Sequence, residues 1–349
     1  MISIGARRRV GRLPMKGSAR MYSGNLPLFD TPFPWAEECR DPLLELSVAR
    51  VDGLSSREKL RLWQAIGSVG QLESLSRLDA ESIVLRRIEG ERWNPKGAVK
   101  AARLDMAWLA PRGIRFIPLL SPSYPPQLRE SYRPPFGLFV WGRLPDPNVP
   151  AVAVVGTRAP TMAGIEAAQD LASGLAARGI CVVSGLARGI DSAAHRGALS
   201  ARGPTLAVLP AGMDDVYPRS NRGLAASIIQ SGGCLIAEHH PGTDMQKYRF
   251  PERNRIIAAL CRSCVVVQAP RRSGALITAE HALSEGRDVF VHSACLGGAR
   301  NEGADGLAEQ GARILADAQD LVDEWTVRET ACYASDRARS GEEETLWRR

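Results

Sequence analysis

The 349-residue sequence contains no apolar run near the roughly 18 residues that a transmembrane helix needs. Its first residues are rich in arginine and lack an apolar signal core, so neither membrane insertion nor secretion is predicted. Seven irregularly spaced cysteines do not form a disulfide framework, and a reducing cytoplasm is the expected setting. Hydrophobic residues make up 44% and charged residues 24%, which is ordinary globular usage. At about 150 residues per domain, the length predicts two domains.

The net charge of +7 is concentrated in two segments. Residues 1–29 hold six basic and no acidic side chains, so the rest of the chain is nearly neutral. Residues 247–272 hold seven basic side chains against Glu252 alone. Such a patch is typical of a surface that binds phosphate backbones, but a solvated face has the same composition.

Composition divides the chain into five segments. Residues 1–42, rich in Gly, Pro and Arg, predict a disordered leader, similar to a transit peptide or an over-long start. Residues 43–113 place apolar side chains at helical spacing and predict a bundle of short helices. Residues 114–150 contain nine prolines and predict an extended connector with one short strand at 138–141. Residues 151–325 form the main domain, and 326–349 are a polar tail.

The main domain alternates short apolar runs with helical stretches, which predicts a doubly wound α/β fold with a parallel sheet. The expected strands are 152–155, 180–183, 206–209, 235–237, 264–267 and 289–291. The expected helices are 165–178, 192–201, 222–231, 254–260, 279–285 and 306–310. Ligands of such folds bind at the carboxyl ends of the strands, so functional residues are expected directly after each apolar run.

Two of these strand ends carry turns that suit a phosphate. Gly156-Thr157-Arg158 offers backbone N–H groups before a helix, and Arg158 adds a guanidinium fork. Ser273-Gly274 opens a helix after the fifth strand in the same way. Neither turn has the G-x-G-x-x-G fingerprint or a Walker A ending, so no nicotinamide cofactor and no ATP hydrolysis are predicted.

The segment 184–191 contains two glycines that allow a tight turn, with Asp191 suited to cap the following helix. His195 lies one turn further on. Without a serine or cysteine partner in view, it is expected to be a core histidine rather than a catalyst.

Aromatic and basic residues are interleaved between Lys247 and Arg255, as single-stranded nucleic-acid binding requires. The alternative is the start of a basic amphipathic helix with Phe250 in the core. Glu238-His239-His240 resembles a metal site but lacks a correctly spaced third ligand, so a loop is favoured. The lone pair Cys261 and Cys264 is expected to pack in the core.

Five segments in this order resemble the DNA-processing protein A family, also called DprA or Smf. They are 154–158, 184–191 with Ala194-His195, 217–221, 250–257 and 273–279. The resemblance implies an extended Rossmann-like domain after a sterile-alpha-motif-like helical domain. It also implies a cytoplasmic, homodimeric, non-enzymatic protein that binds single-stranded DNA and loads the recombinase RecA onto it, without cofactor or metal.

Matched by position, the resemblance and the motifs assign DNA contacts to one set of residues. These are Gly156, Thr157, Arg158, Gly185, Arg219, Asn221, Lys247, Phe250, Arg253, Asn254, Arg255, Ser273, Gly274 and Thr278. We expect phosphates to lie on the helix N-termini and basic side chains, and one or two bases to stack on Phe250.

The sequence departs from the family pattern at four places. His292-Ser293 replace a Pro-Gly, Asp305 replaces an Asn, Ala163 replaces a Tyr and Gln268 replaces a Glu. The C-terminal winged-helix domain of many members has no room in this chain.

Two other functions are compatible with parts of this pattern. A nucleotide phosphoribohydrolase has a related architecture, but its Pro-Gly-Gly-x-Gly-Thr turn is missing here. A scaffolding protein that no longer binds DNA is the other alternative.

Overall fold

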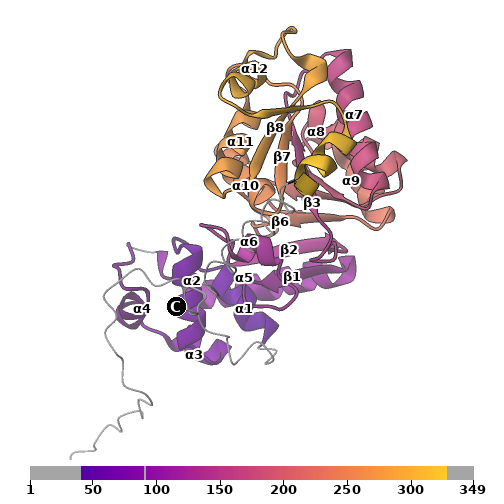
Figure 1. The fold of residues 1–349 in the computed structure, drawn as a ribbon. Helices are drawn as coiled ribbons and strands as arrows, with labels where there is room; N and C mark the ends of the chain where they lie inside the picture. The colour runs from indigo at the N-terminus through magenta and orange to yellow at the C-terminus, as the bar shows by residue number, and fades with distance from the viewer. Residues whose placement is uncertain (1–40, 90–91, 328–349) are drawn as a thin grey trace, which may run out of the picture. The chain divides into compact units, whose positions relative to one another are not determined.

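The computed structural model describes residues 41–89 and 92–327 (Figure 1). The predicted leader and tail lie outside these ranges except at their inner ends, where Asp41 and Pro42 begin the first helix and residues 326–327 are helical. Among the described residues, no helix has both the length and the apolar character that crossing a bilayer requires.

Five short helices follow one another in the N-terminal region. They are α1 (Pro42–Ala49), α2 (Ser56–Ala65), α3 (Val69–Ser74), α4 (Arg77–Val84) and α5 (Pro95–Leu109). Each begins at a polar side chain that accepts a hydrogen bond from a first-turn N–H group, which explains why the chain breaks into short helices. The capping residues are Asp41, Ser55, Ser68, Ser76 and Asn94.

Residues 114–150, predicted as a connector with one strand, form two strands of the sheet. These are β1 (Ile114–Pro118) and β2 (Gly137–Gly142), with α6 (Pro126–Arg129) between them. The strands pair antiparallel, and β2 pairs antiparallel with β6 (Cys234–Ala237). The prolines do not prevent this because they lie outside the ladder or at its end. The hydroxyl of buried Tyr124 donates to the carbonyl of Pro135 at 3.0 Å, which fixes the loop between the strands.

The nine-stranded sheet has the order β1-β2-β6-β5-β4-β3-β7-β8-β9. Its remaining strands are β3 (Ala151–Val155), β4 (Cys181–Ser184), β5 (Thr205–Leu209), β7 (Ser263–Val266), β8 (Asp288–His292) and β9 (Arg313–Leu315). All pairs from β6 to β9 are parallel, so the predicted doubly wound, mostly parallel fold is confirmed. Strand β9 was not predicted because its three residues carry no apolar run.

The helices of the main domain cover both faces of the sheet. Figure 1 shows α7 (Met162–Ala177), α8 (Ile190–Ser200) and α9 (Arg222–Gln230) on one side, opposite α10 (Arg249–Ala259) and α11 (Gly274–Ser284). Helix α12 (Glu302–Glu309) precedes β9, and residues 318–327 are also helical. Helices α10 and α11 begin five residues before their predicted starts. The reason is that Pro251 and Gly274 fall in first turns, where neither residue interrupts a helix.

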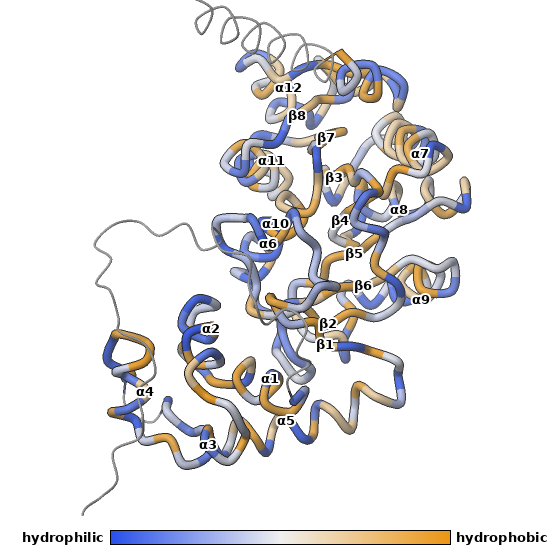
Figure 2. The backbone as a smooth tube through the Cα atoms, turned by 60° about the horizontal axis from the view of Figure 1, so that its bottom comes forward, coloured by the Kyte–Doolittle hydropathy of each residue, from blue (hydrophilic) through white to orange (hydrophobic). Residues whose placement is uncertain are grey.

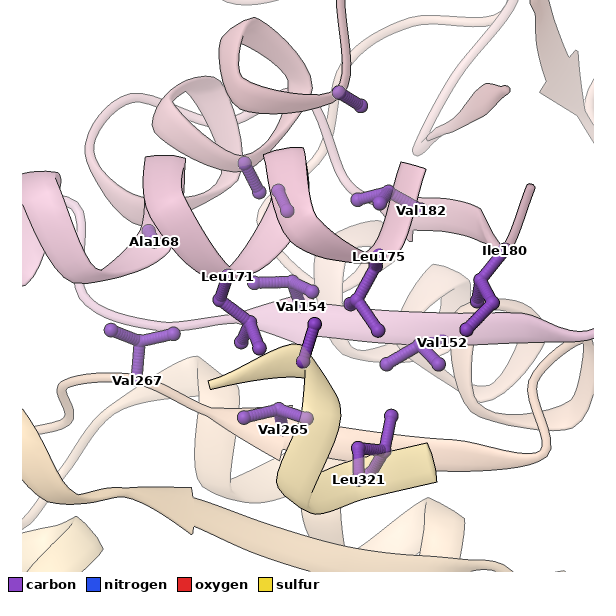
Figure 3. Close-up of a cluster of buried hydrophobic side chains, with 14 of the residues drawn as sticks. Val152, Val154, Ala168, Leu171, Leu175, Ile180, Val182, Val265, Val267 and Leu321 are labelled. Atoms are coloured by element: carbon purple, nitrogen blue, oxygen red, sulfur yellow. The ribbon is translucent and has the colours of Figure 1, made fainter. Parts of the chain in front are cut away.

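The core of this domain lies between the central strands and helices α7 and α8 (Figure 3). Val152, Val154 and Val265 of the sheet contact Leu171 and Leu175 of α7, all with at most 1% of their surface exposed. Hydrophobic residues dominate the central strands, whereas the helices show hydrophilic stretches (Figure 2). Full burial on both faces explains the unbroken apolar strands that the sequence shows.

The strand order reverses direction at β3. From β3 the chain builds β4, β5 and β6 on one side, then returns to place β7, β8 and β9 on the other. The loops that leave β3 and β7 therefore diverge to opposite faces, and ligands of doubly wound folds bind in the crevice that this creates.

Candidate nucleic-acid interface

A hollow of about 280 Å³ lies at this point of reversal. The turn after β3, the first turns of α10 and α11, and Asp191 of α8 surround it. Nine of the fourteen predicted contact residues line it: Gly156, Thr157, Arg158, Phe250, Arg253, Asn254, Ser273, Gly274 and Thr278.

The turn after β3 is held in place by its backbone. A Cβ on Gly156 would lie 2.5 Å from Cγ1 of Ile190 and 2.8 Å from the carbonyl oxygen of Gln268, so only glycine fits. The N–H group of Thr157 donates to that carbonyl at 2.7 Å. These contacts leave Arg158, the next residue, exposed at the mouth of the hollow.

The N-terminus of α11 forms the opposite wall. The hydroxyl oxygen of Ser273 accepts a hydrogen bond from the N–H group of Ala275 at 3.2 Å and caps the helix. A Cβ on Gly274 would meet no atom within 4 Å, so the backbone here is open to an incoming group. Asn254 of α10 donates to the carbonyl of Gly274 at 3.1 Å and joins the two helices. The positive end of the α11 dipole therefore faces the hollow and favours an anion.

Phe250 presents an aromatic ring beside these anion-binding groups. The guanidinium carbon of Arg158 lies 4.6 Å from the centre of the ring, and Tyr217 meets the ring in a T-shaped contact at 5.7 Å. Phe250 is only half-buried, and 43% of Tyr217 is exposed. The alternative of a core staple is therefore not what the structure shows for Phe250.

Arg253 and Asp191 form the floor and are both buried. The Arg253 guanidinium donates to the carbonyls of Gly185, at 2.7 Å, and of Val208. The Asp191 carboxylate accepts from the N–H groups of Gly185, at 3.2 Å, and Ala187, at 3.3 Å. Both side chains thus hold the peptide units of Gly185, and a Cβ there would lie 2.6 Å from the guanidinium carbon.

Burial shifts the pKa values of both Asp191 and Arg253. It raises the pKa of Asp191, and the Arg253 charge acts in the opposite direction. Burial likewise lowers the pKa of Arg253 to about 10, which Asp191 partly offsets. Asp191 was expected to cap α8, but Gly189 holds that position because the carboxylate is directed to the preceding loop.

Five predicted contacts lie outside the lining of the hollow, and two of them are buried. Gly185 lies behind Arg253. The amide of Asn221 donates to the carbonyls of Leu186 and Ala187 and to the hydroxyl of Ser192, so the structure does not offer it to a ligand. The motif at 217–221 therefore contains, in Asn221, a side chain that holds the loop after β4 in place.

The other three are basic side chains that do not line the hollow. Arg255 lies on the opposite face of α10, where it contacts Glu238 at 2.5 Å and lines another cavity, so its contact with DNA stays a prediction. Arg219 is 77% exposed and lies 3.8 Å from Asp215. Lys247 is exposed just before α10. Arg272 lines the hollow but was not among the predicted contacts. The only sequence signal for it is its place in the basic segment 247–272.

His195 is enclosed in the core, as expected. Its Nδ1 lies 2.8 Å from the hydroxyl of Thr205, and burial lowers its pKa to about 3, so the ring is neutral at pH 7. Cys261 and Cys264 are also buried, and burial raises the pKa of both thiols.

The Glu238-His239-His240 segment makes contacts to arginine. Glu238 pairs with Arg255, His239 lies 3.0 Å from Arg249, and His240 lies 3.2 Å from Arg50. Within residues 41–89 and 92–327, no three His, Cys, Asp or Glu side chains are grouped to hold a metal ion.

Three of the four departures from the family pattern have local structural roles. Gln268 accepts from the N–H group of Thr161 at 2.9 Å and donates to the carbonyl of Ala299 at 2.8 Å, which a carboxylate cannot do. Asp305 accepts from Asn301 at 2.8 Å and from the N–H group of Gly297, and it does not line the hollow. His292 accepts from the N–H group of Ala294 at 3.1 Å.

Two solved structures with this fold are both of proteins named DNA processing protein A. DNA processing protein A from Streptococcus pneumoniae superposes with a TM-score of 0.66 at 34% identity, over 82% of this chain and 99% of that one. DNA processing protein A from Helicobacter pylori, described for its single-stranded DNA binding mode, gives 0.53 at 27% identity, over 59% and 94%.

Sequence relatives agree with the structural ones. Protein Smf of Escherichia coli is 33% identical over 81% of this chain and 75% of its own length, and DprA of Bacillus subtilis is 35% identical over 80% and 94%. Residues 115–326 match the family described as DNA recombination-mediator protein A. The predicted resemblance is thereby confirmed, and the chain belongs to the DNA recombination-mediator protein A family.

Proposed function

We propose that this protein binds single-stranded DNA in the hollow between β3 and β7 and acts as a recombination mediator. The observation that carries the proposal is the convergence of Arg158, the open N-terminus of α11 and the ring of Phe250 at one rim of the sheet. The Helicobacter pylori relative, whose description names single-stranded DNA binding, supports the same ligand. Transfer of the strand to RecA, homodimer formation and a cytoplasmic setting belong to this proposal and rest on the family.

The two halves of a nucleotide have separate partners in this scheme. A phosphate lies between the Arg158 guanidinium and the N–H groups of the first turn of α11, with Arg272 in the lining and Lys247 outside it, just before α10. A base stacks on Phe250, which accepts any base because every base offers a π-face. Arg253, Asn221 and Gly185 act behind the surface by fixing the loop after β4.

The same scheme assigns no catalytic turnover to the hollow. Its described lining contains no histidine and no cysteine. The carboxylate of Asp191 is buried and accepts hydrogen bonds from backbone N–H groups, so it is not placed to act on a ligand. Release of free base from nucleoside monophosphates by the purified protein would contradict this part of the proposal.

The direct test is fluorescence anisotropy with a labelled oligothymidylate, a matched duplex and a matched RNA at several salt concentrations. The single strand is expected to bind more tightly than the duplex. Its log K should fall linearly with log salt, with a slope near −0.7 for each phosphate neutralised. A flat salt response, or preference for the duplex, would contradict phosphate binding in this hollow.

Replacing Phe250 by alanine should weaken single-strand binding by about 1–3 kcal/mol, because one base loses its stacking partner. Phe250→Trp should retain most of the affinity, since it keeps an aromatic face. The salt slope should be the same in both variants, because neither removes a phosphate contact. Anisotropy titrations give both quantities, and Leu104→Ala, at an exposed apolar side chain outside the linings of both cavities, is the control.

A further inference from the structure

Helix α10 separates the hollow from a second cavity of about 500 Å³. The helix divides its side chains between the two: Phe250, Arg253 and Asn254 line the first, whereas Arg249, Glu252 and Arg255 line the second. This division follows from the helical period, which places these two sets on different faces. The start of α2 and residues 132–139 complete the second cavity.

The lining of this cavity carries more positive than negative side chains. It contains Arg57, Lys59, Arg133, Arg249 and Arg255 against Asp52, Glu238 and Glu252. Glu238 forms an ion pair with Arg255. Burial lowers the pKa of His239 to about 4, so the imidazole ring of His239 is neutral at pH 7. Positive charge is therefore available to a ligand chiefly from Arg57 and Arg133.

These two arginines lie at exposed positions beside an aromatic ring. The Arg57 guanidinium carbon lies 5.8 Å from the ring centre of Tyr132, whose surface is 73% exposed. The guanidinium of Arg133 is exposed and has no hydrogen-bond or ion-pair partner in the described part of the chain. An exposed ring with one cation against it, and a second cation on the next residue in the same lining, match the base and phosphates of an unpaired polynucleotide.

The surface between the two cavities has the same chemistry. Lys247 and Tyr248 precede α10 and are both exposed, and the guanidinium carbon of Arg249 lies 5.3 Å from the ring centre of Tyr248. A strand that leaves the hollow around the N-terminus of α10 therefore meets a cation and a ring before it reaches the second cavity.

We propose that the second cavity is an additional subsite for the same single strand, with Arg57 and Arg133 on its phosphates and Tyr132 against a base. This inference rests on the proposed function, because the strand is anchored in the hollow first. It predicts a footprint that extends around the N-terminus of α10 to the start of α2.

The test uses the full chain and oligothymidylates from about 4 to about 16 nucleotides, the range of site sizes found for single-strand-binding folds. Arg57→Gln combined with Arg133→Gln should leave binding of the shortest oligomers unchanged. Binding of the longest should weaken, and its salt slope should shrink by about 1.4, or 0.7 for each of two phosphates. Arg103→Gln with Arg196→Gln removes two exposed arginines elsewhere and is the matched control.

The outcomes separate this subsite from the hollow itself. Equal weakening at every length, or long-oligomer binding equal to that of the control, would overturn the subsite. If no oligomer bound the wild-type protein, the proposed function would fail instead. A length-dependent gain in affinity that the double variant alone loses would establish the second subsite.

Discussion

Alanine at both Arg158 and Lys247 is expected to reduce single-strand affinity by about 100-fold or more. Each substitution removes one charged donor to a phosphate, and hydrogen bonds to charged groups contribute about 1.5–3 kcal/mol each. The salt slope should fall by about 1.4, because two phosphates are no longer neutralised. Anisotropy titrations of an oligothymidylate at three salt concentrations measure both effects.

Folding should be almost unaffected by this double substitution, since both side chains are exposed. The contact of Arg158 with Phe250 is lost, which costs about 0.5–1 kcal/mol at an exposed site. Alanine at Lys100 and Arg196, two exposed cations away from both cavities, changes the net charge equally and is the control. Retained affinity in the Arg158/Lys247 variant, or equal loss in the control, would refute the assignment.

The contact between Arg158 and Phe250 has a mechanistic consequence. The guanidinium of Arg158 lies over the ring on which a base is proposed to stack. A phosphate competes for the same guanidinium through stronger, charge-assisted hydrogen bonds. Phosphate binding therefore frees ring surface for the base, and the two halves of a nucleotide are expected to bind cooperatively.

The sequence predicted the sheet well because its central strands are buried on both faces. Val152–Val155 and Cys264–Val267 read as short apolar runs for that reason, and each run locates a strand end within one residue. Since parallel strands share one rim, the turns at Gly156 and Ser273 were expected to meet, and both line the hollow. This part of the site follows from local pattern and topology alone.

The sequence could not assign the individual arginines of α10. Arg253 and Arg255 are two residues apart, and both read as cations in one basic patch. Which faces the hollow depends on the start of the helix, which the pattern placed five residues late. Burial then separates them further, because Arg253 bonds to backbone carbonyls under the hollow whereas Arg255 pairs with Glu238.

The edge formed by β1 and β2 was missed for a different reason. Prolines in 114–150 mark residues that cannot donate in a ladder, but they do not show where the ladder ends. The pairing of β2 with β6 joins residues about a hundred positions apart, for example Phe139 and Ala237. Local composition carries no information about such a partner.

The Arg253→Met substitution is expected to lower the free energy of unfolding by about 3–5 kcal/mol. The Arg253 side chain is 5% exposed and donates to the carbonyls of Gly185 and Val208. Its removal leaves both carbonyls without this donor and takes away the positive charge that acts on buried Asp191, and uncompensated buried groups of this kind are strongly destabilising. Urea titrations monitored by circular dichroism measure the change, with exposed Arg196→Met as the control expected within about 0.5 kcal/mol.

The loss in the Arg253→Met variant should depend on pH. Burial already raises the pKa of Asp191, and removing the Arg253 charge raises it further. A carboxyl whose folded pKa lies above its unfolded value loses stability as pH rises through the folded pKa, so the variant should be less impaired at pH 5 than at pH 7. Adding Asp191→Asn should restore part of the stability at pH 7 and flatten the difference. An equal loss at both pH values would show that Asp191 does not feel the Arg253 charge.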